Sequence, residues 1–153
     1  MLAYHRRPVC LSFISTDLPI LSTVETAATL YQKGKEQFHL LLHQSRVSVD
    51  KSETSNEDRL LWLEISPYRV IMTVQANGKS GYRHFWEQGI YGMSRYWLHS
   101  YSEQESSCFL LSNYTRSLKL EGYHLPQRLR VEYELWSEKV QLGHYIFHLE
   151  IHD

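Results

Sequence analysis

The chain has 153 residues, of which 42% are apolar and 22% are charged. This length is typical of one globular domain, so residues 1–153 are expected to form a single domain. Sixteen Lys and Arg against 17 Asp and Glu give a formal net charge of -1, which argues against bulk attraction to nucleic acid or to an anionic bilayer. No stretch approaches the roughly 20 apolar residues of a membrane-spanning helix, so no membrane span is expected.

The cysteines and the N-terminus bear on the compartment. Cys10 and Cys108 lie far apart without metal-ligand spacing, which favours two semi-buried free thiols, with one long-range disulfide as the alternative in an oxidising compartment. The basic start followed by apolar residues imitates a signal peptide, but Asp17 and Pro19 interrupt the apolar run. We therefore expect a cytoplasmic protein.

The N-terminal third predicts one strand and one helix. The apolar segment Pro8–Ser15 is rich in residues that favour β structure. Ser22 followed three residues later by Glu25 has the form of a capping box, and Gly34 stands where a helix C-terminal cap belongs. This pattern predicts a short helix over Thr23–Lys33.

The middle of the chain predicts a series of strands. Residues 36–49 fit either a helical stripe or β alternation, and we favour a strand. The segment Asp50–Asp58 has no apolar residue and predicts a flexible polar loop. Asn77 and Gly78 are a strong two-residue hairpin signal. The strands expected in this region are Leu60–Ile65, Arg69–Gln75, Ser80–Glu87, Ser94–Tyr101, Ser107–Leu111 and Thr115–Glu121.

The last two strands, Arg128–Trp136 and His144–His152, alternate clearly enough to predict their register. Matching the apolar faces sets up three pairs, which are Leu129 with Leu149, Val131 with Phe147, and Tyr133 with Tyr145. The same register places Arg128 opposite Glu150 and Glu134 opposite His144 on the solvent face. A three-residue loop centred on Lys139 is expected to close this hairpin.

Together these elements predict a mainly β protein, an antiparallel meander that closes into a barrel, half-barrel or sandwich, with the short N-terminal helix packed on it. The expected layout of one helix and a meander resembles the calycins in architecture alone, without a family motif.

Two groups of histidines are spaced like metal ligands on a helix. His144, His148 and His152 recur every four residues, as do His39 and His43. On a strand, four residues span about 13 Å, which is too far for a shared ion. The C-terminal group is therefore expected to be a solvent-facing row. His39 and His43 would supply two ligands of a metal site only if residues 36–45 are helical.

The segment from Gly81 to His99 is dense in aromatic and arginine residues, which supply contact area, stacking and bidentate hydrogen bonds at binding sites. Two glycines in the connector Glu87–Gly92 permit close backbone approach beside this group. The alternative is that Phe85, Trp86 and Trp97 are core residues. The predicted ligand- or partner-binding residues are Arg83, His84, Trp86, Tyr91, Arg95 and Trp97.

Three functions fit these residues. The first is a non-enzymatic binding module for an apolar or aromatic small ligand, and the second is an accessory or assembly protein that docks on a partner protein through an exposed aromatic segment. The third is a small enzyme that uses His84, Glu87, Tyr91 and Arg95 as acid, base and anion clamp. The sequence has no nucleophile motif, phosphate loop or dinucleotide fingerprint, so it names no catalytic residue and no cofactor.

The first two functions predict different structures. A ligand carrier needs an apolar internal cavity of about 300 Å³ or more, whereas an interaction protein needs a filled core and an exposed aromatic patch.

Overall fold

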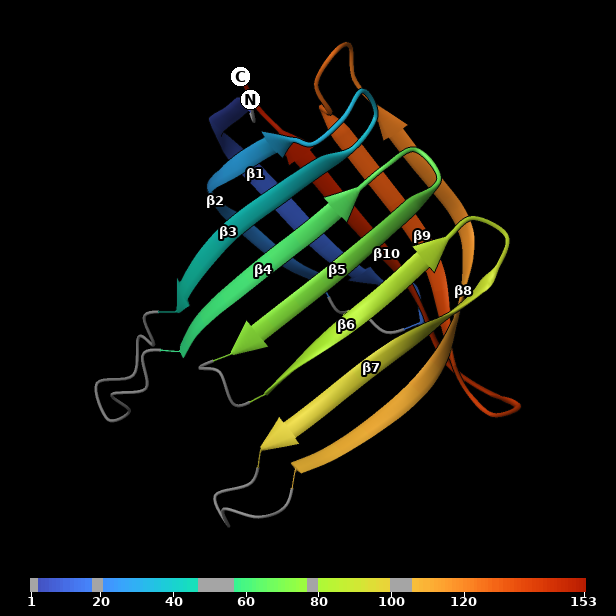
Figure 1. The fold of residues 1–153 in the computed structure, drawn as a ribbon. Helices are drawn as coiled ribbons and strands as arrows, with labels where there is room; N and C mark the ends of the chain where they lie inside the picture. Colours follow the sequence, from blue (N-terminus) through green and yellow to red (C-terminus); the bar gives the residue numbers. More distant parts are fainter. Residues whose placement is uncertain (1–2, 18–20, 47–56, 77–79, 100–105) are drawn as a thin grey trace.

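The computed structural model is a closed barrel of ten antiparallel strands, in which each strand pairs with its neighbours in sequence (Figure 1). The structure describes residues 3–17, 21–46, 57–76, 80–99 and 106–153. The strands are β1 (Ala3–Ser15), β2 (Leu21–Gln32), β3 (Phe38–Arg46), β4 (Glu57–Ile65), β5 (Arg69–Ala76), β6 (Ser80–Glu87), β7 (Tyr91–His99), β8 (Ser106–Glu121), β9 (Arg128–Ser137) and β10 (Val140–Ile151).

Closure depends on the pairing of the first and last strands. β1 runs antiparallel to β10 with Val9 opposite Ile151 and Phe13 opposite Phe147, and its other edge pairs with β2. The C-terminal end of β10 consequently lies beside the middle of β1, with Ile151 opposite Val9. Of the three architectures that the sequence allowed, the barrel is the one confirmed.

The predicted helix over Thr23–Lys33 is wrong, because all of this segment except Lys33 lies in β2. β2 pairs with β1 along its whole length, from Leu21 opposite Ile14 to Gln32 opposite Ala3. Its β-branched residues suit a pleated strand, and alternate positions such as Ala28 and Leu30 are fully buried. Long-range pairing therefore overrides the local capping signal.

Other predicted strands and turns can be compared with the structure. Residues 38–46 form a strand, as favoured. The two short strands expected at Ser107–Leu111 and Thr115–Glu121 are parts of the single strand β8. Most of the predicted loop Asp50–Asp58 lies outside the described residues, and its last two residues begin β4. The predicted turn at Asn77 and Gly78 also lies outside them.

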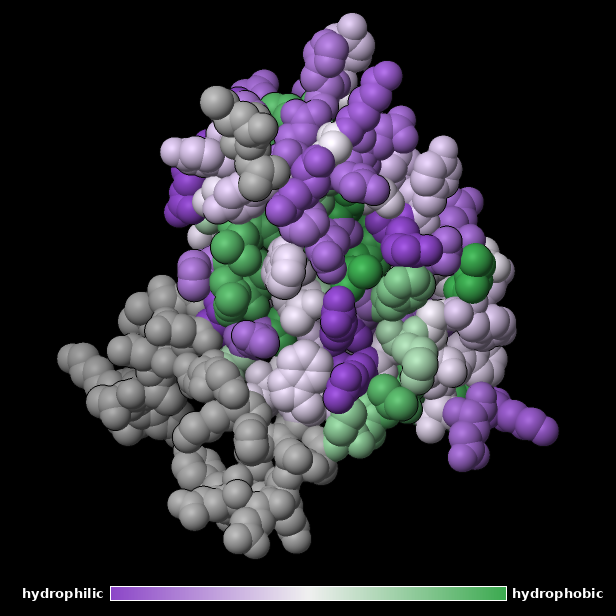
Figure 2. Space-filling view, in the orientation of Figure 1, coloured by the Kyte–Doolittle hydropathy of each residue, from purple (hydrophilic) through white to green (hydrophobic). Residues whose placement is uncertain are grey.

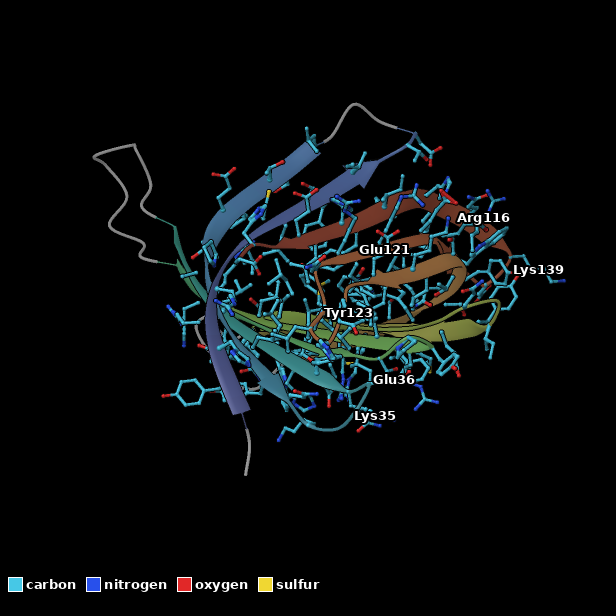
Figure 3. The ribbon with its side chains drawn as sticks, turned by 90° about the horizontal axis from the view of Figure 1, so that it is seen from above. Lys35, Glu36, Arg116, Glu121, Tyr123 and Lys139 are labelled. Carbon is cyan, nitrogen blue, oxygen red and sulfur yellow. The ribbon has the colours of Figure 1, made fainter. Side chains whose placement is uncertain are left out.

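The register predicted for the C-terminal hairpin is confirmed, including the pairs Val131 with Phe147 and Arg128 with Glu150. The turn differs, since only Glu138 and Lys139 separate the strands and the extra residue is accommodated by a bulge between Gln141 and Gly143. Glu138 has a φ of 55°, a conformation that a tight turn requires. Lys139 stands at the tip of this hairpin, at the margin of the barrel (Figure 3).

The core fills the inside of the barrel, because alternate residues of every strand point inward. Trp86, Met72 and Phe147 are among its fully buried side chains, packed with leucines from β1 to β4, β9 and β10. Both cysteines are free, Cys10 half-buried and Cys108 exposed. The described residues include no helix that is long and apolar enough to cross a membrane.

Candidate functional site

The barrel wall divides the six predicted site residues into two groups. On β6, His84 and Trp86 point inward and are 3% and 0% exposed, whereas the preceding Arg83 is exposed. On β7, Arg95 and Trp97 point outward and line a groove with Arg83. Strand alternation therefore creates an interior aromatic cluster and a separate outer surface from one stretch of sequence.

The interior cluster is centred on Trp86. Its indole stacks on the His84 ring at 5.1 Å between centroids and lies 4.8 Å from Tyr133 and 5.6 Å from Phe147. Trp86 is therefore a core residue, as the alternative interpretation of this segment predicted. That interpretation is wrong for Phe85 and Trp97, which line hollows on the outside of the barrel.

His84 belongs to a buried polar chain. Its Nδ1 lies 2.6 Å from the Ser94 hydroxyl oxygen, and the Asn113 amide donates to the same oxygen at 2.8 Å. Burial lowers the pKa of His84 from 6.5 to about 3. The imidazole is consequently neutral at physiological pH, and the Ser94 hydroxyl can donate its hydrogen to Nδ1.

Tyrosines complete the interior. Burial raises the pKa of Tyr82, and it raises the pKa of Tyr96 to about 12 with further contributions from Tyr82 and Tyr145. The pKa of Tyr133 is raised well above 10, again chiefly by burial. These three phenols therefore stay protonated at physiological pH.

The four side chains of the catalytic hypothesis do not converge. His84 points into the barrel, while Arg95 and Tyr91 are exposed on its outside. The outward-facing Glu87 forms an ion pair with Arg69 at 3.6 Å. His84 is therefore separated by the barrel wall from its proposed acidic and cationic partners.

The outer surface carries an open groove of about 530 Å³ across β4 to β7. Its flanking aromatic side chains are Trp62 and Trp97, and Thr73 is a small residue between them. Gly81 makes room for Trp97, because a Cβ built there would lie 2.8 Å from the indole and 2.2 Å from the Val74 carbonyl oxygen. The residues that line the groove are Leu60, Trp62, Thr73, Gln75, Arg83, Arg95 and Trp97.

A second hollow of about 370 Å³ adjoins the groove and shares Arg83 and Arg95 with it. Its apolar members include Met93 and Leu110, which are 53% and 55% exposed. Figure 2 shows apolar side chains gathered among polar ones on this side of the molecule. The lining residues are Arg83, Phe85, Met93, Arg95, Cys108 and Leu110, and we call the two hollows together the outer face.

Two arginines stand at the centre of the outer face. Arg83 and Arg95 are directly opposite each other on β6 and β7. Arg83 has a weak ion pair with Glu64 at 3.8 Å, whereas Arg95 Nε donates to the Cys108 sulfur at 3.3 Å. Among the described residues, no carboxylate forms an ion pair with Arg95.

Tyr91 lies farther along β7, with 65% of its surface exposed. Its ring is 4.9 Å from that of Tyr114, the residue opposite it on β8. Tyr91 therefore extends the exposed aromatic surface beyond the groove, without contributing to the core.

The histidine groups lie on strands. His39 is on β3, and its Nδ1 accepts a hydrogen bond from the Trp62 indole at 3.3 Å. Burial lowers the pKa of His39, partly offset by the nearby Glu64. His144 and His148 sit on β10 within 4.0 Å of glutamate oxygens. No group of three or more potential ligands within the described segments could hold a metal ion.

Sequence reasoning missed Trp62, Met93 and Leu110, which complete the outer face. The signal for Trp62 is present, because Leu61 and Leu63 on either side of it mark the opposite, buried face of β4. The contribution of Leu110 depends on its pairing with Arg95 across β7 and β8, which the sequence does not display.

Comparisons with known proteins identify the fold. No protein-family model matches the chain, and no curated protein matches it significantly. Among solved structures, the crystal structure of the ywiB protein from Bacillus subtilis is similar with a TM-score of 0.60, over 99% of this chain and 94% of that one. The two sequences are 11% identical. The chain therefore has a β-barrel fold like that of the ywiB protein.

Proposed function

We propose that this protein is a non-enzymatic binding module that docks on a partner protein through the outer face of β4 to β8. The observation that carries the proposal is the continuous surface on which exposed Trp62, Met93 and Leu110 surround the Arg83 and Arg95 pair. Trp, Met and Arg are enriched at protein interfaces, and grouped exposed apolar side chains mark interaction sites.

The shape of the outer face favours a protein over a small ligand. Small-molecule sites bury most of the ligand in a concave pocket, whereas the two hollows here are open and adjoin across Arg83 and Arg95. Inside the barrel, Trp86, Tyr133 and Phe147 pack against one another with at most 4% exposure. The small-ligand hypothesis therefore has less support from the structure than the docking hypothesis.

The closed barrel also limits how a partner can bind. At the outer face, Gly81–His84 of β6 pairs with Ser94–Trp97 of β7, and the other edges of these two strands pair with β5 and β8, so β6 and β7 offer no free edge there for β-strand addition. A partner that binds at the outer face must instead contact side chains on the barrel surface. The outer face supplies such side chains in a connected group.

The experiment is selection of random twelve-residue peptides, displayed on phage, against the immobilised full chain. We expect enriched peptides whose affinity falls at least tenfold for Leu110→Ser and less than twofold for Leu21→Ser. Leu21 is a matched control because it is 65% exposed on β2, away from the outer face. Equal affinity for both variants, or no enrichment over a blank surface, would overturn the proposal.

A further inference from the structure

We propose that the partner segment bound by the outer face carries a carboxylate, from Asp or Glu, that is held between Arg83 and Arg95 and flanked by apolar or aromatic residues. This inference rests on the proposed docking function and names the chemistry of the partner. The observation that supports it is the pairing of two positively charged residues, Arg83 and Arg95, on neighbouring strands.

The arrangement of Arg83 and Arg95 is unfavourable in the isolated chain. Residues directly opposite each other on antiparallel strands have Cβ atoms about 5 Å apart, and like charges there repel. The two guanidinium groups line both hollows of the outer face. An anion bound between them would offset this repulsion, because it would accept charge-assisted hydrogen bonds from both guanidinium groups.

The charges around the pair leave a positive excess. Glu64 is 3.8 Å from Arg83 and also 3.9 Å from His39, so it is shared. Glu87 is engaged by Arg69 at 3.6 Å. Among the described residues, no carboxylate on the outer face therefore offsets the charge of Arg95.

This charge pattern argues against a second copy of the chain as the occupant. In a two-fold interface centred on the outer face, the arginine pairs of both copies would approach one another and repel. A partner with the opposite charge avoids this cost. The surrounding Trp62, Trp97 and Leu110 would exclude water from the ion pair, which strengthens the attraction.

The neighbouring side chains also define what flanks the carboxylate. Trp97 and Trp62 offer aromatic surface on one side of the arginines, and Met93 and Leu110 offer flexible apolar contacts on the other. Residues of a bound segment on either side of its Asp or Glu would therefore be aromatic or aliphatic.

The test uses the peptides selected on the full chain, synthesised with a fluorescent label and measured by anisotropy. We expect the enriched sequences to contain Asp or Glu beside apolar residues, and replacement of that acid by Asn or Gln to weaken binding at least tenfold. Arg95→Gln should cause a similar loss. Arg6→Gln is the control, because Arg6 is exposed on β1, four strands away from β7 around the barrel.

Two outcomes would overturn the inference without removing the docking function. One is enriched peptides that lack acidic residues but still depend on Leu110, and the other is acidic peptides that bind Arg95→Gln as tightly as the original chain. A labelled twelve-residue oligothymidylate is tested in parallel. Binding of this probe with the same dependence on Arg95, in place of peptide binding, would assign the pair to nucleic acid and contradict the proposal.

Discussion

Arg83 and Arg95 face each other across β6 and β7 on the outside of the barrel, and within the described residues the carboxylate that pairs with either of them is Glu64, 3.8 Å from Arg83. We predict that Arg95→Gln leaves the free energy of unfolding unchanged or raises it by up to about 0.5 kcal/mol, because it removes a cross-strand repulsion. Salt should reduce the gain by screening the charges. Urea unfolding at low and high salt measures this, and a loss above about 1 kcal/mol would show that Arg95 is structural.

Substitution of the two predicted site tryptophans, Trp86 and Trp97, should change stability by different amounts, because they lie on opposite sides of the barrel wall. Trp86 is fully buried, so Trp86→Ala should destabilise the protein by about 3–5 kcal/mol. Trp97 is half-buried over Gly81 on the outside, so Trp97→Ala should cost about 1–2 kcal/mol. Denaturant unfolding of both variants tests the assignment, and equal losses would contradict it.

Gly81 should be intolerant of a side chain. A Cβ at this position would lie 2.2 Å from the Val74 carbonyl oxygen and 2.8 Å from the Trp97 ring. We predict that Gly81→Ala destabilises the barrel by about 1–3 kcal/mol through overpacking.

Gly34→Ala is the matched control, because its nearest neighbour would be 3.6 Å away in ordinary contact. It should be neutral or slightly stabilising through the reduced entropy of the unfolded chain. Thermal unfolding compares the two variants, and similar melting temperatures would show that Gly81 is not under this constraint.

His84 should make the protein less stable in acid. Its pKa is lowered by burial to about 3, whereas in the unfolded chain it is near 6.5. Between these values the unfolded state binds a proton that the folded state does not, so stability falls as the pH falls, with a slope approaching ~1.4 kcal/mol per pH unit. Above pH 6.5 the group is neutral in both states and has no such effect.

Urea unfolding between pH 7 and pH 4 checks this linkage in the original chain and in His84→Gln. The difference in stability between the two should shift in favour of the variant as the pH falls. A difference that stays constant over this range would show that His84 is not buried in its neutral form.

The fold was predictable where local alternation and long-range pairing agree. Apolar faces of Arg128–Trp136 and His144–His152 are regular enough to define the register of β9 and β10. In β2, the capping signal at Ser22 and Glu25 predicts a helix, but all twelve residues of the strand pair with β1. Such long-range pairing cannot be recognised from the local sequence. The helix prediction failed for this reason.

The candidate site was predictable only as a stretch of sequence. Alternation correctly sends Arg95 and Trp97 to one side of β7 and Tyr96 to the other. Which side faces solvent depends on the closure of the barrel, and that closure places His84 inside and Arg83 outside. The sequence therefore identified β6 and β7 of the site, but it missed the residues from β4, β5 and β8 and mixed residues from two separate surfaces.

The four tryptophan indoles provide the most direct test of binding on the outer face. Trp62 and Trp97 line the groove, Trp86 lies inside the barrel, and the Trp136 indole donates to Glu134 on β9 at 2.9 Å. The measurement is the ¹⁵N–¹H spectrum of the four indole groups during titration with the selected acidic peptide. We predict shifts for Trp62 and Trp97 with Trp86 and Trp136 unchanged, and a shift of Trp86 with Trp62 and Trp97 unchanged would contradict binding at the outer face.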